Sequence, residues 1–171
     1  KRKLDNFFII RLYIYMQLFP IVILLLFLSL ACSQSSDPKH YFNKGQYKKA
    51  FLLWKSLASG GDSASQNYLG IQYYLGLGVE RNLELAKKWY EKAASQDFAD
   101  AQYNLGVMYE NGEFVEQDFI TASMWFYAAS KNGNKNAKKR IDNLLNDDKL
   151  FPNQYNHAKT LAEEYFTTEI K

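Results

Sequence analysis

The chain has 171 residues, a length that suits one domain with appendages. Its single cysteine excludes a framework of internal disulfides and any multi-cysteine zinc site. The net charge of +3 arises in residues 1–31, which hold four of the 21 basic residues and one of the 18 acidic ones, so the remainder is neutral with 17 of each. Neither nucleic acid nor an anionic surface is therefore indicated as a partner.

Residues 1–31 have the pattern of a targeting segment, in which a basic flank precedes an apolar run from Leu18 to Ala31. The run is shorter than the roughly 20 apolar residues of a membrane-spanning helix, so it predicts a signal peptide. An uncleaved membrane anchor is the alternative, because residues 7–14 are also apolar. Met16 is an alternative start, and the sequence leaves open whether residues 1–15 are translated.

The apolar run ends in Leu28-Ser-Leu-Ala-Cys32, which resembles the lipobox of bacterial lipoproteins. Ala31 fits that motif, whereas Ser29 stands where the family usually has leucine. The resemblance implies lipidation of Cys32 and a membrane-anchored lipoprotein of the bacterial cell envelope that faces the periplasm. It leaves open the choice between inner and outer membrane. Residues 32–39 are expected to form the lipidated end and a polar tether.

Residues 40–64 are predicted to be a truncated N-terminal repeat. Apolar residues at helical spacing, including Ala50 and Trp54, predict a helix over residues 46–59 that Gly60-Gly61 ends. Its partner, a shortened first helix, is expected around Pro38–Asn43.

Residues 65–100 and 101–136 hold one helical-hairpin pattern written twice. The matching positions, each 36 residues apart, are Leu69-Gly70 and Leu105-Gly106, Tyr73 and Tyr109, Gly76 and Gly112, Ala86 and Ala122, and Trp89 and Trp125. A fixed period of this size predicts a solenoid. Asn82 and Asp118 are expected to cap the second helices at their N-termini.

Two features of the repeats make predictions about packing. Gly70 lies in mid-helix, where glycine costs about 1 kcal/mol relative to alanine, so a close approach of a neighbouring helix is expected there. Trp89 and Trp125 are each expected to bury roughly 200 Å² and so to hold the helix pairs together.

Residues 137–171 are predicted to be a degenerate repeat followed by a C-terminal capping helix. Ile141 stands where Leu105 stood, but Asp142 replaces the glycine. A helix is expected to begin at Pro152 and to close the end of the core with a last amphipathic stripe, Tyr155 to Phe166.

The segments Ala101 to Gly112, Ala86 to Ala94 and Leu69 to Val79 resemble the signature of the Sel-one-like repeat, a relative of the tetratricopeptide repeat. The resemblance covers about residues 46–142. It implies an all-α fold, a right-handed α/α superhelical solenoid of stacked antiparallel helix pairs, that acts as a scaffold for other proteins. Phe114 replaces the second turn glycine, Gly78, so that loop is expected to differ.

An enzyme is the alternative class, because some family members were linked to β-lactam hydrolysis. Those members have paired cysteines in every repeat, which this chain lacks. Ser36 and Lys39 match a Ser-x-x-Lys spacing, but no companion motif accompanies them in the sequence. His40 and His157 lie in no metal-ligand spacing, and no catalytic residue, metal or cofactor is predicted.

A row on the first helices is the predicted partner-binding surface. Its members are Tyr68, Gln72, Asn104, Met108 and Asn111. Amides, a tyrosine and an adaptable methionine suit contact with a protein or peptide, and such helices line the concave side of solenoids. The alternative is that these side chains pack between neighbouring helices. The partner is not identified by the sequence, and a monomer is expected.

Overall fold

The computed structural model describes residues 19–20 and 37–168. The predicted signal peptide, apart from Phe19 and Pro20, and the predicted lipidation site Cys32 lie outside the described residues. Among the helices of the described part, none combines the length and the apolar character needed to cross a bilayer.

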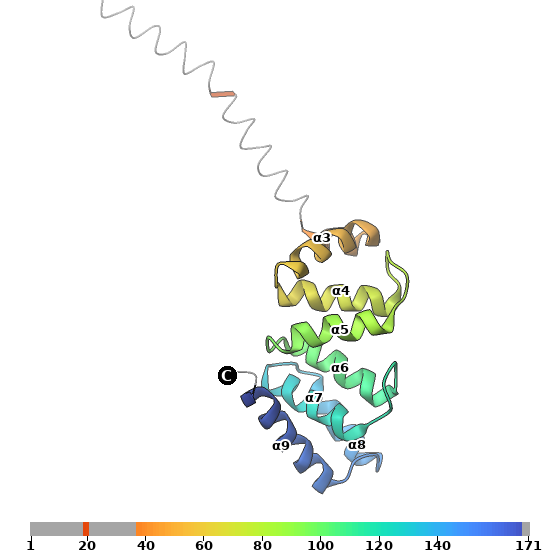
Figure 1. Cartoon of the computed structure of the whole chain (residues 1–171), viewed down its shortest axis with the longest axis vertical. Coiled ribbons are helices and arrows are strands. Elements are labelled where there is room, and N and C mark those ends of the chain that lie inside the picture. Colours follow the sequence, from red (N-terminus) through yellow and green to blue (C-terminus); the bar gives the residue numbers. More distant parts are fainter. Residues whose placement is uncertain (1–18, 21–36, 169–171) are drawn as a thin grey trace, which may run out of the picture.

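Between residues 37 and 168 the chain forms helices joined by short turns. They are α2 (Pro38–Asn43), α3 (Tyr47–Ser59), α4 (Ser63–Leu75), α5 (Leu83–Ala94), α6 (Ala99–Asn111), α7 (Phe119–Lys131), α8 (Ala137–Asn146) and α9 (Pro152–Thr168). From α2 to α8 each helix packs on the next, and α3 to α7 form successive layers of one stack (Figure 1). The predicted all-α solenoid is confirmed.

Side-chain caps start the helices where the sequence predicted them. The Asn82 side chain accepts a hydrogen bond from the backbone N–H of Leu85 at 2.9 Å, at the start of α5. Asp118 caps α7 by accepting from the N–H groups of Ile120 and Thr121 at 2.9 and 3.2 Å. Both predicted caps are confirmed, and each satisfies N–H groups that a helix leaves without an internal partner.

The turn after α6 has nearly the backbone conformation of the turn after α4, so the expected difference at Phe114 is wrong. Phe114 has a φ of +63°, close to the +74° of Gly78. A Cβ on Gly78 would lie 2.4 Å from the backbone carbon of Tyr47, whereas the Phe114 side chain is 54% exposed. Glycine is therefore required at residue 78 by a neighbouring backbone, and Phe114 keeps the same φ at a cost in strain.

Each full repeat brings a ring of its second helix against a glycine of its first. A Cβ on Gly70 would lie 2.5 Å from Cε1 of Tyr90, and a Cβ on Gly106 would lie 2.5 Å from Cε1 of Phe126. Both distances are far below van der Waals contact. The close helix approach predicted at Gly70 is confirmed and recurs 36 residues later.

The two repeat tryptophans differ in burial. Trp125 is buried, and its ring centroid lies 5.3 Å from that of Tyr165 on α9. Trp89 is only partly buried, and the Lys92 ammonium lies 4.4 Å from the centroid of its ring. Trp89 nevertheless packs against the buried cluster of Phe51, Ala58 and Leu69 on α3 and α4, so both tryptophans help to hold the helices together, with Trp89 at the edge of the core.

Helix α9 closes the far end of the core. It begins at Pro152, as predicted, and lies against α7 (Figure 1). Ala158 and Ala162 are buried in the same cluster as residues of α5, α6 and α7. The predicted capping helix is confirmed.

A buried glutamine at the start of each repeat binds the end of the preceding helix. Nε2 of Gln66 donates to the Ala58 carbonyl, and Nε2 of Gln102 donates to the Ala94 carbonyl, both at 3.2 Å. The side-chain oxygen of the same glutamine, Oε1 of Gln102, also accepts from Nδ2 of Asn132 at 3.0 Å. Each of these carbonyls also accepts from a backbone N–H of the following turn, Gly61 for Ala58 and Asp97 for Ala94, so the glutamine amides add a second hydrogen bond that fixes consecutive hairpins to one another.

Candidate interaction surface

Two members of the predicted partner-binding row are buried, so their assignment to partner contact is wrong. Gln72 is fully buried, and its Nε2 donates to the carbonyls of Tyr47 and Leu77 at 2.9 Å each. Met108 is 1% exposed and belongs to the main hydrophobic cluster. The alternative interpretation, packing between helices, holds for both residues.

The other members of the row remain partly or fully accessible. Tyr68 stacks on Trp54 with ring centroids 4.5 Å apart. Nδ2 of Asn104 donates to Oδ1 of Asn67 at 2.9 Å, which links α6 to α4. Asn111 is exposed at the end of α6. Their role in partner binding stays a prediction.

Between α4 and α6 lies a pocket of about 210 Å³, here called the α4–α6 pocket. It is lined by Ile71, Tyr74, Leu75, Tyr90, Asn104 and Val107. Of these residues, only Asn104 belongs to the row predicted from sequence. Leu75 is 54% exposed, whereas Tyr90, contributed by α5, is 3% exposed. The pocket therefore has an accessible apolar wall and a deeply placed tyrosine.

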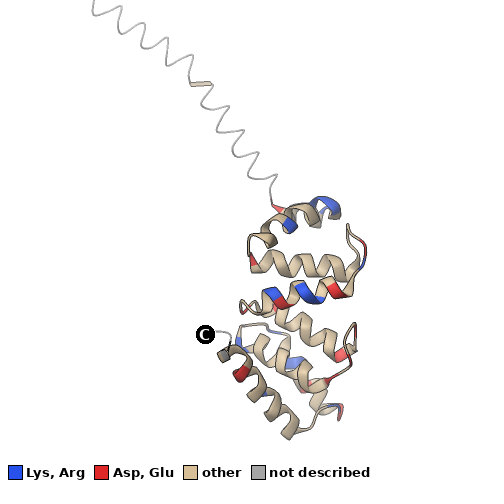
Figure 2. Ribbon diagram, viewed as in Figure 1, with Lys and Arg blue, Asp and Glu red and all other residues tan. Residues whose placement is uncertain are grey.

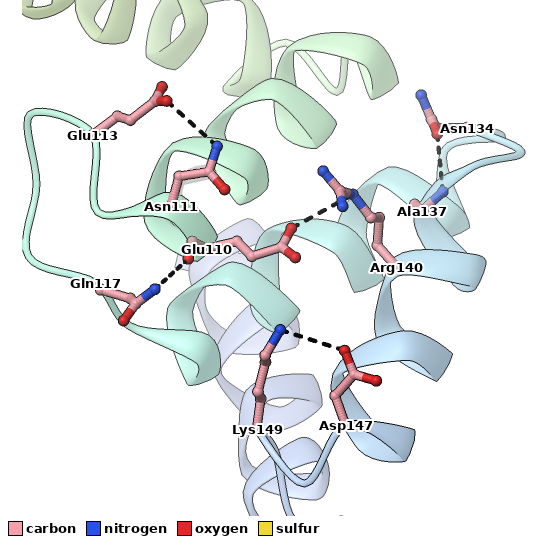
Figure 3. A network of polar contacts seen from close by, with 9 residues as sticks. All are labelled: Glu110, Asn111, Glu113, Gln117, Asn134, Ala137, Arg140, Asp147 and Lys149. Atoms are coloured by element: carbon pink, nitrogen blue, oxygen red, sulfur yellow. Dashed lines mark hydrogen bonds and ion pairs between the residues drawn. The ribbon is translucent and has the colours of Figure 1, made fainter.

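A carboxylate accepts a hydrogen bond from one of the tyrosines that line this pocket. The Tyr74 hydroxyl donates to Oε2 of Glu113. Nδ2 of Asn111 lies 3.5 Å from Oε1 of the same carboxylate (Figure 3). Burial, followed by the hydrogen bond to Glu113, raises the pKa of Tyr74 to about 12. Tyr74 is thus a neutral donor over the physiological pH range, and Glu113 is its acceptor.

The equivalent place between α6 and α8 holds an ion pair. Nε of Arg140, on α8, lies 3.5 Å from Oε2 of Glu110, on α6 (Figure 3). Counting by 36 residues, Glu110 corresponds to Tyr74 and Arg140 corresponds to Asn104. Arg140 of this chain therefore stands where the first repeat has Asn104, a residue that lines the accessible α4–α6 pocket.

The turns beside the α4–α6 pocket are acidic. Residues 76–82 and 112–118 contain four acidic residues, Glu80, Glu113, Glu116 and Asp118, against one basic residue, Arg81. Figure 2 shows red along these turns, whereas the blue of the central stack gathers on α5. Nε of Arg81 donates to the Tyr74 carbonyl at 3.0 Å. The local excess of negative charge favours a cationic group at this edge.

Residues 63–98 and 99–134 each match the model of the Sel1 repeat family. Two consecutive segments of the chain, 72 of its 171 residues, are thus similar to the Sel1 repeat. These matches begin two residues before the repeat boundaries used in the sequence analysis and keep the same 36-residue period.

Two curated proteins are similar to about a third of this chain. The chain is 47% identical over 55 residues to DAP3-binding cell death enhancer 1 of Rattus norvegicus, covering 32% of this chain and 11% of that protein. It is 39% identical over 56 residues to a sel1-like repeat-containing protein of Acanthamoeba polyphaga mimivirus, covering 33% and 10%. The chain thus spans about a tenth of the length of these relatives.

Solved structures share the fold. A Sel1 repeat protein from Oxalobacter formigenes has a TM-score of 0.59 at 34% identity, over 63% of this chain and 44% of that one. A protective antigen of uropathogenic Escherichia coli strains with an SLR fold has a TM-score of 0.69 at 31% identity, over 80% and 30%. The chain covers less than half of each.

Around the Sel1 repeats, the other candidate residues form no chemical site within the described part. His40 and His157 are exposed, and no group of three or more described His, Cys, Asp or Glu residues could hold a metal. The Lys39 ammonium lies 5.2 Å from the ring centroid of Tyr68, and Ser36 lies outside the described residues. A second cavity, of about 270 Å³, is lined by residues of α7 and α9, among them Tyr127 and Phe166.

Proposed function

We propose that this chain is a non-catalytic scaffold that binds a protein or peptide through the surface between α4 and α6. The α4–α6 pocket carries the proposal, because it opens between successive first helices and presents apolar surface from Ile71, Leu75 and Val107. Concave apolar sites with a few polar groups are the usual places for recognition. The Sel1 repeats support protein partners, and one relative is described by its name as DAP3-binding.

Two exposed leucines allow a matched test of this surface. Leu75 lines the pocket and is 54% exposed, whereas Leu52 lies on α3 and is 59% exposed. A photo-crosslinking amino acid placed at residue 75 in the native host should capture a specific partner that the same group at residue 52 does not. Leu75→Lys should then reduce co-purification of that partner at least about tenfold, because a charge in an apolar contact is costly. Equal capture at both positions, or retention with Leu75→Lys, contradicts the proposed surface.

The second part of the proposal is that the scaffold is anchored in the bacterial envelope, facing the periplasm, by acyl chains on Cys32. The lipobox-like residues Leu28–Cys32 support this interpretation. Each buried CH₂ of an acyl chain contributes about 0.8 kcal/mol, so several chains together give stable anchoring.

Mass spectrometry and fractionation test the anchor. The wild-type protein should begin at Cys32 and carry the mass of the acyl groups, and Cys32→Ser should lose that mass and its lipid-dependent membrane association. An intact chain in the membrane with no added mass, unchanged by Cys32→Ser, would instead identify residues 7–31 as an uncleaved anchor.

A further inference from the structure

The floor of the α4–α6 pocket is a buried tyrosine with a free hydroxyl. Tyr90 is 3% exposed and lines the pocket, and its hydroxyl takes part in none of the hydrogen bonds among the described residues. The hydroxyl oxygen is not among the fully buried polar atoms that lack a partner, so it is open to the pocket and free to bond to a guest. Burial and, to a smaller extent, the neighbouring Tyr74 and Glu113 raise the pKa of Tyr90. Its hydroxyl therefore stays neutral and can accept a hydrogen bond.

The carboxylate at the edge of the pocket also has no cationic partner. Glu113 accepts from the Tyr74 hydroxyl and is approached by the Asn111 amide, but no described Lys or Arg forms an ion pair with it. Arg81, the basic residue of the two adjacent turns, donates its Nε–H to the Tyr74 carbonyl and lies 6.0 Å from the centroid of the Tyr74 ring. The negative charge of Glu113 is therefore available to a guest.

We propose that the α4–α6 pocket takes one lysine or arginine side chain of an extended partner peptide. The alkyl stem would lie against Ile71, Leu75 and Val107, and the cationic head would reach the Glu113 carboxylate and the Tyr90 oxygen. This inference rests on the proposed function, because it names the chemistry that the same surface recognises.

Size and charge both select this guest. A volume of about 210 Å³ is below the roughly 300–1,000 Å³ of small-molecule sites and suits a single side chain. Lysine and arginine place a charge at the end of an apolar stem, which matches apolar walls that end at a carboxylate. An acidic guest would meet Glu113 together with the excess negative charge of the neighbouring turns.

The second repeat supports the assignment from within the chain. Arg140 occupies the position equivalent to Asn104 and pairs there with Glu110, which corresponds to Tyr74. An arginine against a carboxylate at this position is therefore an arrangement that the Sel1 stack already accommodates. In the first repeat the carboxylate comes from Glu113 instead, and the cation has to come from another molecule.

Selection from a random phage-displayed peptide library tests the inference on the full chain in detergent micelles. Bound peptides should share a lysine or arginine next to an apolar residue. Replacing that residue by norleucine, or introducing Glu113→Gln, should weaken binding at least about tenfold, and added salt should weaken the wild-type complex. Tyr90→Phe should weaken binding several-fold without loss of stability, because no described group hydrogen-bonds the hydroxyl that it removes.

Leu75→Lys and Leu52→Lys separate the two levels of the proposal. Peptides that Leu75→Lys displaces but that share no basic residue, or that bind Glu113→Gln as tightly as wild type, overturn the basic-side-chain inference and leave the proposed surface standing. A selection that gives no peptide displaced by Leu75→Lys, or only peptides displaced equally by Leu52→Lys, overturns both.

Discussion

The contact between Gly70 and the Tyr90 ring predicts the outcome of a single added methyl group. In Gly70→Ala the new Cβ would lie 2.5 Å from Cε1 and 2.6 Å from Cδ1 of Tyr90, about 1 Å inside ordinary carbon–carbon contact. Overpacking of this kind typically costs about 1–3 kcal/mol. Alanine also gains about 1 kcal/mol of helix propensity over glycine. We therefore expect a net loss of up to about 2 kcal/mol in the free energy of unfolding.

A double-mutant cycle isolates the contact. Tyr90→Val ends the side chain at Cγ, so the two ring carbons that the new Cβ would meet are absent. In that background Gly70→Ala should stabilise the protein by up to about 1 kcal/mol, since only helix propensity remains. The coupling between residues 70 and 90 is then about 2 kcal/mol.

Urea unfolding followed by circular dichroism and by tryptophan fluorescence measures these free energies. Coincident transitions by the two probes establish that a two-state treatment applies to this repeat protein. If Gly70→Ala has the same effect with Tyr90 and with Val at residue 90, the close approach does not determine stability, and the explanation given for this glycine is refuted.

Four other substitutions test the capping, strain and titration described above. Asp118→Ala should cost about 1–2 kcal/mol in urea unfolding, because it removes the cap of α7. Phe114→Gly should stabilise by up to about 1 kcal/mol, because it relieves a left-handed φ, whereas Gly78→Ala should destabilise. Tyr74 has a folded pKa of about 12 against 10.0 unfolded, so its contribution to stability is intact below pH 10 and is lost as the pH rises toward 12. Alkaline unfolding of Tyr74→Phe should show a smaller pH dependence.

The sequence predicted the elements that depend on local or periodic signals. Positions repeated every 36 residues set the helix pairs, and short polar residues before apolar runs placed the caps at Asn82 and Asp118. Gly70 was informative because glycine destabilises the middle of a helix, so its presence there indicates a close steric contact. That contact is with the Tyr90 ring. Each of these signals is contained within one repeat.

What the sequence could not predict depends on contacts between repeats. Gln72 looks like an exposed polar residue, but its amide binds the Tyr47 carbonyl of the preceding helix and is buried. Phe114 adopts nearly the φ of Gly78, although phenylalanine rarely takes a left-handed backbone conformation. At an exposed turn position the cost in strain is tolerated, and the sequence carries no signal for this. The α4–α6 pocket combines residues of three helices, and its tyrosine floor comes from the helix that the pattern assigned to the core.

The two repeats share the glycine–ring contact, but only one ring lines the pocket. Phe126 is fully buried and has no polar group, whereas Tyr90 carries a hydroxyl and lines the α4–α6 pocket. Gly70→Ala and Gly106→Ala should therefore cost similar stability, since their Cβ atoms meet equivalent ring carbons at 2.5 Å. Only Gly70→Ala moves a group that a guest would touch, so only it should change the affinity for a basic peptide once the folded fraction is matched. Equal changes in affinity would mean that stability, rather than the position of the Tyr90 hydroxyl, governs binding.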